Sequence, residues 1–285
     1  MECISVFDML KIGIGPSSSH TLGPWRAAER WIKELKTEHL FDKVETITVH
    51  LYGSLSLTGK GHATDLAVML GLSGADPETV VVESIPNIIT SINSKKILNL
   101  NTERSINFNP ENDIVFDKTF LPFHANGMTF TASINKNKYT STFYSIGGGF
   151  VVKEERIIDK ENKALKKEFP FPIDKATELL NYCKTENKSI SEIVLENEKS
   201  LRTDLEIDFE FSRIWNTMLE CMYIGCHTEG TLAGGLNVRR RAFDMHQNLK
   251  ENLVYSNKEE WLETIRMTKV PFRKIFKWVS CFALA

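Results

Sequence analysis

The stretch Glu45–Tyr52 reads ETITVHLY, and its apolar side chains alternate with polar ones. Ile, Val, Thr and Tyr are common in strands, and a period of two places every second side chain on one face of a sheet. The segment therefore predicts a β-strand with one buried face. Four further segments indicate strands: Val80–Glu83, Asp113–Phe116, Met128–Ile134 and Tyr139–Ser145.

Helices are expected around these strands. Their apolar residues recur at helical spacing in Thr21–Leu35, His62–Gly71 and Asn87–Ser94. Because several strands follow one another with no helix between them, the pattern predicts an α+β domain with a mixed, mainly antiparallel sheet.

The pattern changes from Pro172 onward and becomes helical. The expected helices are Ile173–Lys184, Ser191–Asn197, Ile207–Cys226 and Trp261–Ala285. The charged stretch Lys153–Lys167 separates the two halves and is interpreted as a solvated connector. The last residues, FKWVSCFALA, are apolar with no polar tail, so either a partner covers them or the natural polypeptide continues.

Composition narrows the class of protein. The 285 residues include 35 Lys and Arg against 37 Asp and Glu, and 42% are hydrophobic, as in a globular protein. This near-neutral charge gives no reason to expect binding to nucleic acid or to a membrane surface. No apolar run approaches the roughly 20 residues of a spanning helix, and the N-terminus does not resemble a signal peptide. A cytoplasmic protein is expected.

The cysteines are odd in number and scattered. They are Cys3, Cys183, Cys221, Cys226 and Cys281. A disulfide framework would be even and denser, so a reducing compartment fits best. On one helix, Cys221 and Cys226 would point about 140° apart, which makes a poor ligand pair. We interpret both as small core residues rather than metal ligands.

Residues 11–21 read KIGIGPSSSHT and form the first candidate site. The two glycines allow close approach of a ligand to the backbone, and free N–H groups at a helix start attract a carboxylate or phosphate. The polar side chains of this anion site would be Ser17, Ser18, Ser19 and His20. The alternative is a serine-capped helix after a tight turn.

Residues 53–65 read GSLSLTGKGHATD and superficially resemble a nucleotide-binding P-loop. The spacing fails, and Gly61 stands where a P-loop needs Ser or Thr, so nucleotide binding is rejected. What remains is a loop that delivers His62 to a helix start, where the dipole favours neutral imidazole. A neutral imidazole can act as a general base, but a structural cap is an equal alternative.

Two further loops complete the set. In FHANG, residues 123–127, His124 and Asn126 would face a ligand, although Asn-Gly is also an ordinary turn signal. In SIGGG, residues 145–149, three glycines indicate closely packed backbone. Three histidine-bearing loops and a serine-rich segment suggest a site for a small acid, but they name no reaction.

Residues 5–24, SVFDMLKIGIGPSSSHTLGP, resemble the opening of the iron–sulfur-dependent L-serine dehydratases of the single-chain type. The likeness continues in order through GKGHATD, FHANGM, YSIGGGF, PIDKATELL, SISEIVLENE and ECMYIGCHTEGTLAGGLNVRRRA. It covers essentially the whole chain. The lysine-bearing signature of the pyridoxal-phosphate serine dehydratases is not found.

This resemblance implies a domain organisation. Residues 1–153 would form the β domain, similar to the allosteric substrate-binding domain of some phosphoglycerate dehydrogenases. Residues 154–205 would hold the connector and first helices, and 206–285 the start of the helical catalytic domain. The resemblance also implies a cytoplasmic homodimer that serves amino-acid catabolism and gluconeogenesis.

The implied reaction is β-elimination of L-serine to pyruvate and ammonia, with a [4Fe–4S] cluster as Lewis acid. By the same resemblance His62 is the first candidate for the base that removes the Cα proton, and His124 and His20 are further catalytic candidates. The implied substrate-binding residues are Ser17, Ser18, Ser19, Thr21, Asn126 and Ser145.

One departure from the family matters. Family chains run on past the equivalent of Ala285, and their cluster cysteines lie in that later part. None of the five cysteines matches those positions, so no metal ligand is predicted and this chain alone is expected not to turn over serine. The alternatives are a non-catalytic module that binds a small amino acid, and a cluster completed by a separate polypeptide.

Overall fold

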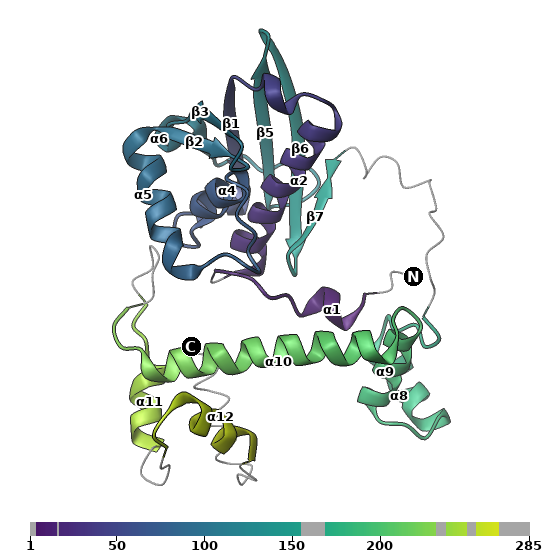
Figure 1. The fold of residues 1–285 in the computed structure, drawn as a ribbon. Helices are drawn as coiled ribbons and strands as arrows, with labels where there is room; N and C mark the ends of the chain where they lie inside the picture. The colour runs from purple at the N-terminus through teal and green to yellow at the C-terminus, as the bar shows by residue number, and fades with distance from the viewer. Residues whose placement is uncertain (1–3, 16, 155–168, 232–237, 250–254, 268–285) are drawn as a thin grey trace. The chain divides into compact units, whose positions relative to one another are not determined.

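The computed structural model describes residues 4–15, 17–154, 169–231, 238–249 and 255–267 (Figure 1). The chain divides into two compact units. The first unit is Glu2–Glu168 and the second is Phe169–Ala285 together with Met1. Each is described by itself.

The first unit is built on a five-stranded sheet in the order β4-β1-β5-β6-β7. The strands are β1 Thr46–Tyr52, β4 Ile114–Asp117, β5 Gly127–Ile134, β6 Asn137–Gly147 and β7 Phe150–Lys153. β1 runs parallel to β4, and the other pairs are antiparallel. The predicted α+β class and the mixed, mainly antiparallel sheet are therefore confirmed.

Helices cover one face of this sheet. The main ones are α2 Gly23–Thr37 and α4 Thr64–Leu72, which pack against each other (Figure 1). The alternation in ETITVHLY holds, because Ile47, Val49 and Leu51 are buried under these helices. Trp31 of α2 is completely buried and stacks on Phe130 of β5, with 5.2 Å between ring centroids.

The remaining elements of the first unit are short. They are α1 Val6–Met9, the π-helical turn η1 Ser18–Leu22, η2 Phe41–Lys43, α3 Gly53–Leu57, η3 Val82–Ser84, α5 Ile85–Lys95, β2 Ile97–Leu100, β3 Arg104–Asn107 and α6 Pro110–Asp113. Strands β2 and β3 form a separate antiparallel hairpin that the sequence pattern did not predict.

The strand predicted at Val80–Glu83 is wrong. Its backbone makes turn hydrogen bonds instead, from Val80 N to Asp76 O at 2.9 Å and from Ser84 N to Val81 O at 2.9 Å. Pro86 stands in the first turn of α5 and favours the helical start that follows. The valines were read as strand formers, but Val81 and Val82 are exposed, so no packing holds them in a sheet.

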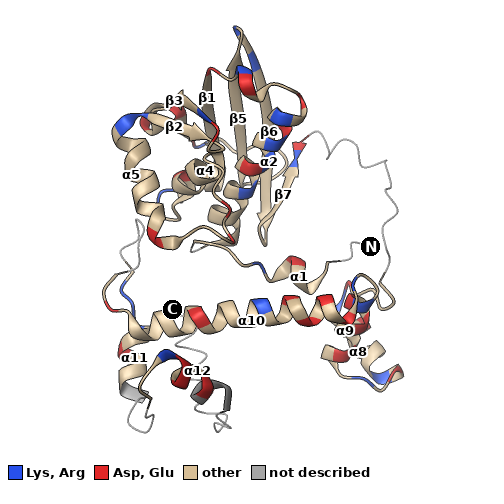
Figure 2. Ribbon diagram, in the orientation of Figure 1, with Lys and Arg blue, Asp and Glu red and all other residues tan. Residues whose placement is uncertain are grey.

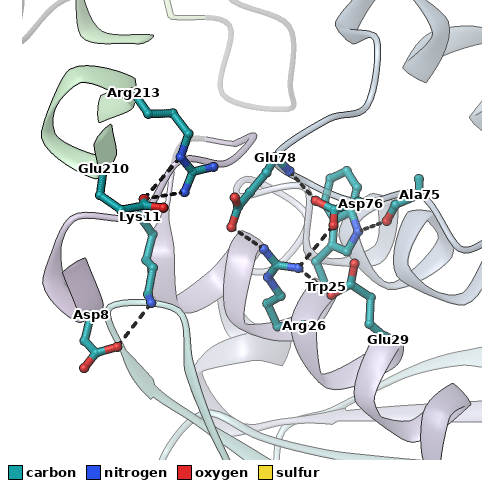
Figure 3. A network of polar contacts seen from close by, with 10 residues as sticks. All are labelled: Asp8, Lys11, Trp25, Arg26, Glu29, Ala75, Asp76, Glu78, Glu210 and Arg213. Atoms are coloured by element: carbon teal, nitrogen blue, oxygen red, sulfur yellow. Dashed lines mark hydrogen bonds and ion pairs between the residues drawn. The ribbon is translucent and has the colours of Figure 1, made fainter. Parts of the chain in front are cut away.

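An ionic cluster ties the segment before α5 to α2 (Figure 3). The guanidinium of Arg26 lies among three carboxylates. These belong to Glu29, Asp76 and Glu78, at 2.9, 3.8 and 2.7 Å. Beside it, Trp25 Nε1 donates to the Ala75 carbonyl at 2.6 Å. Burial is the main reason that the pKa of Glu29 is raised, although Arg26 opposes this.

The second unit is helical among its described residues. Its helices are α8 Ala176–Thr185, α9 Ile190–Lys199, α10 Asp204–His227, α11 Ala242–Leu249 and α12 Lys258–Met267. The first three confirm predicted helices, and capping boxes at Ser189 and Thr203 begin α9 and α10. The predicted helix Trp261–Ala285 is described only as far as residue 267, and most of the predicted connector also lies outside the described residues.

The core of the second unit contains Leu219, Met222, Cys226 and Trp261. Cys226 is buried but Cys221 is exposed, so the prediction of two core cysteines is right only for Cys226. The angular separation of the two positions around α10 explains the difference.

The charged residues of the two units are mixed in sign, in keeping with the near-neutral net charge of the sequence. Figure 2 shows basic and acidic residues interspersed along the helices of both units. No helix in the described part of the chain is long and apolar enough to cross a membrane.

Candidate functional site

The loop that follows β1 is fixed against the FHANG loop. Gly53 N donates to Thr119 O at 2.8 Å, and Ser54 N donates to Ala125 O at 2.9 Å. Gly53 has φ +53°, and a Cβ at this position would lie 2.5 Å from Ala125 O. Only glycine fits both this conformation and this close approach. The start of the GSLSLTGKGHATD segment is thereby held beside His124 and Asn126.

His20 is held from both sides by serine hydroxyls. Its Nδ1 lies 2.8 Å from Ser19 Oγ, and its Nε2 lies 2.9 Å from Ser54 Oγ. Its ring centroid is 4.9 Å from that of His62. Two of the three predicted catalytic histidines, which are 42 positions apart in the sequence (62 − 20), are therefore neighbours in the fold.

His62 has a defined tautomer. Its Nδ1 lies 3.0 Å from the carbonyl oxygen of Thr58. A carbonyl only accepts hydrogen bonds, so Nδ1 carries a proton, and in the neutral ring Nε2 keeps the lone pair. Ala63, the next residue, has a left-handed φ of 54°, which is strained for alanine and turns the chain just before α4. His62 thus presents the basic nitrogen that a general base requires.

Burial favours neutral His20. Desolvation is the largest cause that lowers the pKa of His20 below 6.5, and the nearby charge of His62 lowers it further. A hydrogen bond with the Ser54 backbone acts in the opposite direction and offsets part of the shift. Burial and the nearby charge of His62 therefore both favour the neutral form of His20.

This depressed pKa predicts that acid destabilises the fold through His20. Between the folded pKa and the unfolded value of 6.5 the unfolded chain binds more protons, so His20's contribution is complete above pH 6.5 and is lost as the pH falls. Urea unfolding of the chain and of His20→Gln, above and below pH 6.5, checks this. We expect a smaller loss on acidification in the variant, and an equal loss in both would contradict it.

Three predicted substrate-binding side chains donate hydrogen bonds to backbone carbonyls. Ser145 Oγ donates to Ser19 O at 2.7 Å, and Asn126 Nδ2 donates to Ser145 O at 3.1 Å. Thr21 Oγ1 donates to His62 O at 2.8 Å. All three residues are buried. These hydrogen bonds join the motif loops to one another and so fix the backbone that carries the His20–His62 pair.

His124 occupies a different place. Its Nδ1 accepts from Asn126 N at 3.1 Å, which closes the FHANG turn. The structure connects this turn to His20 indirectly, through the Ala125 carbonyl and Ser54 and through Asn126, Ser145 and Ser19. A chain of hydrogen bonds therefore joins the turn of His124 to the His20–His62 pair. Among the described contacts, the ring of His124 touches neither of the two.

A small cavity of about 170 Å³ opens beside the serines. Its lining includes Lys11, Gly13, Gly15, Ser17, Ser18 and Gly148. Lys11 Nζ forms a long ion pair, 3.5 Å to the Asp8 carboxylate, and lies 5.8 Å from the centre of the Phe150 ring. Ser17 Oγ caps η1 by accepting from His20 N at 3.1 Å. A cavity with one ammonium, two hydroxyls and glycine backbone suits a carboxylate.

Four residues of the site were missed at the sequence level. They are Lys11, Ser54, Thr58 and Thr64. The contact between Thr58 and His62 follows the four-residue spacing of a helical turn and was readable from the sequence. Ser54 and Thr64 contact His20 across 34 and 44 positions, and no local pattern signals such pairs.

The described residues do not supply a metal site. Among residues 4–15, 17–154, 169–231, 238–249 and 255–267, no group of three or more His, Cys, Asp or Glu could hold a metal ion. The residues of these ranges therefore do not provide the donor set of a [4Fe–4S] cluster.

Comparison with known proteins agrees with the motifs. Residues 5–156 match the family model of the serine dehydratase beta chain. The chain is 42% identical over 284 residues to L-serine dehydratase 1 of Escherichia coli and 39% identical over 286 residues to L-serine dehydratase of Haemophilus influenzae. Each alignment covers 99% of this chain and 59% of the relative.

A third relative, L-serine dehydratase of Streptomyces coelicolor, is 43% identical over 254 residues, which are 87% of this chain and 55% of that protein. The chain thus spans about 59% of the length of the first relatives. The family match covers the sheet, both histidines of the pair and the serine-lined cavity. The chain belongs to the serine dehydratase beta chain family.

Proposed function

We propose that the polypeptide carrying this chain is an L-serine dehydratase, a lyase that converts L-serine to pyruvate and ammonia. The names of the relatives support this substrate. The single observation that carries the proposal is the hydrogen bond between His62 Nδ1 and the Thr58 carbonyl, because it leaves Nε2 as a base beside the serine-rich turn.

In this proposal His62 Nε2 accepts the Cα proton of serine. The electron pair of that C–H bond forms the Cα–Cβ double bond, and the β-hydroxyl departs as water with the proton that His62 returns, which leaves His62 neutral again. The resulting aminoacrylate tautomerises to an imine, which water hydrolyses to pyruvate and ammonia. Neutral His20 beside His62 assists, because a cationic neighbour would oppose the arrival of this proton.

The substrate carboxylate lies at the serine-lined cavity. Ser17 and Ser18 offer hydroxyls, and Lys11 offers a positive charge. Lys11 is thus added to the six substrate-binding residues that the resemblance implies. Among those six, Ser19, Thr21, Asn126 and Ser145 hold the loops in place. His124 is the remaining catalytic candidate and would act from the FHANG turn.

A charge-removing variant tests the carboxylate site. Lys11→Met should raise the KM for L-serine by about 10-fold or more, because a hydrogen bond to a charged group contributes about 1.5–3 kcal/mol. The kcat should change little, since the carboxylate is bound alike in ground and transition states. Lys138→Met, at an exposed position in β6, is the control. An unchanged KM in Lys11→Met would remove Lys11 from the site.

The resemblance also carries proposals that reach beyond the site. Residues 1–153 act as the β domain, 154–205 as connector and first helices, and 206–285 as the start of the catalytic domain of a cytoplasmic homodimer. The [4Fe–4S] cluster belongs to the complete protein.

The experiment is an assay of the polypeptide purified anaerobically from its native source. Pyruvate is measured after addition of L-serine, with D-serine as the control, and the intact mass is recorded on the same sample. The proposal expects pyruvate from L-serine only. Absence of pyruvate from an iron-loaded, folded sample would contradict the assigned reaction.

A further inference from the structure

The short helix α3, Gly53–Leu57, touches both histidines of the pair. Ser54, near its start, places Oγ 2.9 Å from His20 Nε2. Thr58, the residue after its end, accepts from His62 Nδ1 at 3.0 Å. One turn of chain therefore contacts the two imidazoles, at Nε2 of His20 and at Nδ1 of His62.

The two contact points are rigidly joined. The Ser54 carbonyl accepts from Thr58 N at 3.1 Å and from Thr58 Oγ1 at 2.9 Å. The Ser54 backbone is in turn held by Ala125 O. Both ends of the turn are held by hydrogen bonds that do not involve the Ser54 hydroxyl. The backbone of Ser54 therefore stays in place whether or not its hydroxyl contacts His20.

The hydroxyls around His20 constrain the orientation of its ring. A neutral imidazole has one donor and one acceptor nitrogen, and each nitrogen here faces a serine hydroxyl. With Ser19 on Nδ1 and Ser54 on Nε2, the ring cannot rotate or flip without losing a partner. Without Ser54, only Ser19 would orient the ring beside His62.

We propose that Ser54 is a positioning residue that holds His20 against His62 for the reaction, and that α3 sets the geometry of both imidazoles. This role rests on the proposed function, since it acts through His20 and His62 and not on the substrate. His62 is the titratable group that faces His20 at close range in the described structure.

Three variants separate positioning from helix stability. Ser54→Ala removes the hydroxyl, and Ser54→Thr retains one. Ser56→Ala alters the same helix α3 at a residue for which no side-chain contact with His20 is described. Equal thermal unfolding of the three proteins confirms that α3 and the first unit remain folded.

The first readout needs no activity. Histidine-ring NMR of the 285-residue chain reports the hydrogen bond at His20 Nε2 and the ring contact between His20 and His62. Because Ser54 Oγ is the side-chain partner of His20 Nε2, Ser54→Ala should move the nitrogen resonance of Nε2 and weaken the ring contact with His62, while Ser54→Thr should restore both and Ser56→Ala should leave both unchanged. An unmoved Nε2 resonance in Ser54→Ala would overturn the proposal.

The second readout is turnover by the complete protein. Ser54→Ala should lower kcat by about 10- to 100-fold with little change in KM, the size seen when a partner that orients a functional histidine is removed. Equal losses in Ser54→Ala and Ser56→Ala would show a merely structural effect and overturn the proposal. If the wild-type protein forms no pyruvate but the His20 Nε2 resonance moves in Ser54→Ala as expected, the proposed function fails while Ser54 still positions His20.

Discussion

His62→Gln is expected to lower the turnover of L-serine by about 10²- to 10⁴-fold, which is the usual contribution of a general base. Glutamine keeps much of the size and polarity of histidine, so the loops stay in place, but it cannot accept the Cα proton. The measurement is kcat for pyruvate formation by the complete, anaerobically purified protein.

The matched control for this variant is His50→Gln. His50 lies on β1, half-buried, with its ring 6.0 Å from that of Tyr52 and on the opposite strand face from Ile47, Val49 and Leu51. We expect this control to keep near wild-type turnover. Near-normal kcat in His62→Gln would exclude His62 as the base.

Trp31→Ala is expected to destabilise the first unit by about 3–5 kcal/mol, because it removes a large buried side chain and leaves a cavity. Trp31 has no exposed surface and joins α2 to the sheet through its stacking on Phe130. Urea unfolding followed by circular dichroism measures the loss.

Trp31→Phe provides the comparison. The indole N–H of Trp31 has no hydrogen-bond partner in the described structure, so phenylalanine gives up no such bond and keeps the stacking on Phe130. It should therefore retain most of the stability. A loss below about 1 kcal/mol in Trp31→Ala would contradict the assigned core, since fully buried aromatic residues cost more than this when truncated.

Much of the fold could be predicted where side-chain period and burial agree. In Glu45–Tyr52 the alternating residues identified the buried face of β1, and three helices of the second unit follow from their apolar spacing. The pattern failed where local composition and tertiary packing disagree. Val80–Glu83 has strand-forming residues but no sheet to join, and β2 and β3 are too short, at four residues each, to show a clear period.

The candidate site, like the fold, could be predicted only in part from the sequence. Motifs pointed to His20 and His62, and the fold places their rings side by side. Sequence did not reveal that Ser145 and Thr21 would bond to the backbone of Ser19 and His62, because such pairing depends on which loops meet at the end of the sheet. The tautomer of His62 also needed coordinates, since its partner is a carbonyl and not a side chain.

The most direct test of the central claim is a crystal structure of the complete polypeptide carrying His62→Gln, soaked with L-serine. The slow variant should trap substrate beside residue 62, with the carboxylate at Ser17, Ser18 and Lys11 and the Cα hydrogen directed at the substituted side chain. Serine bound only elsewhere, such as in the groove between α5 and the β2–β3 hairpin, would contradict the account.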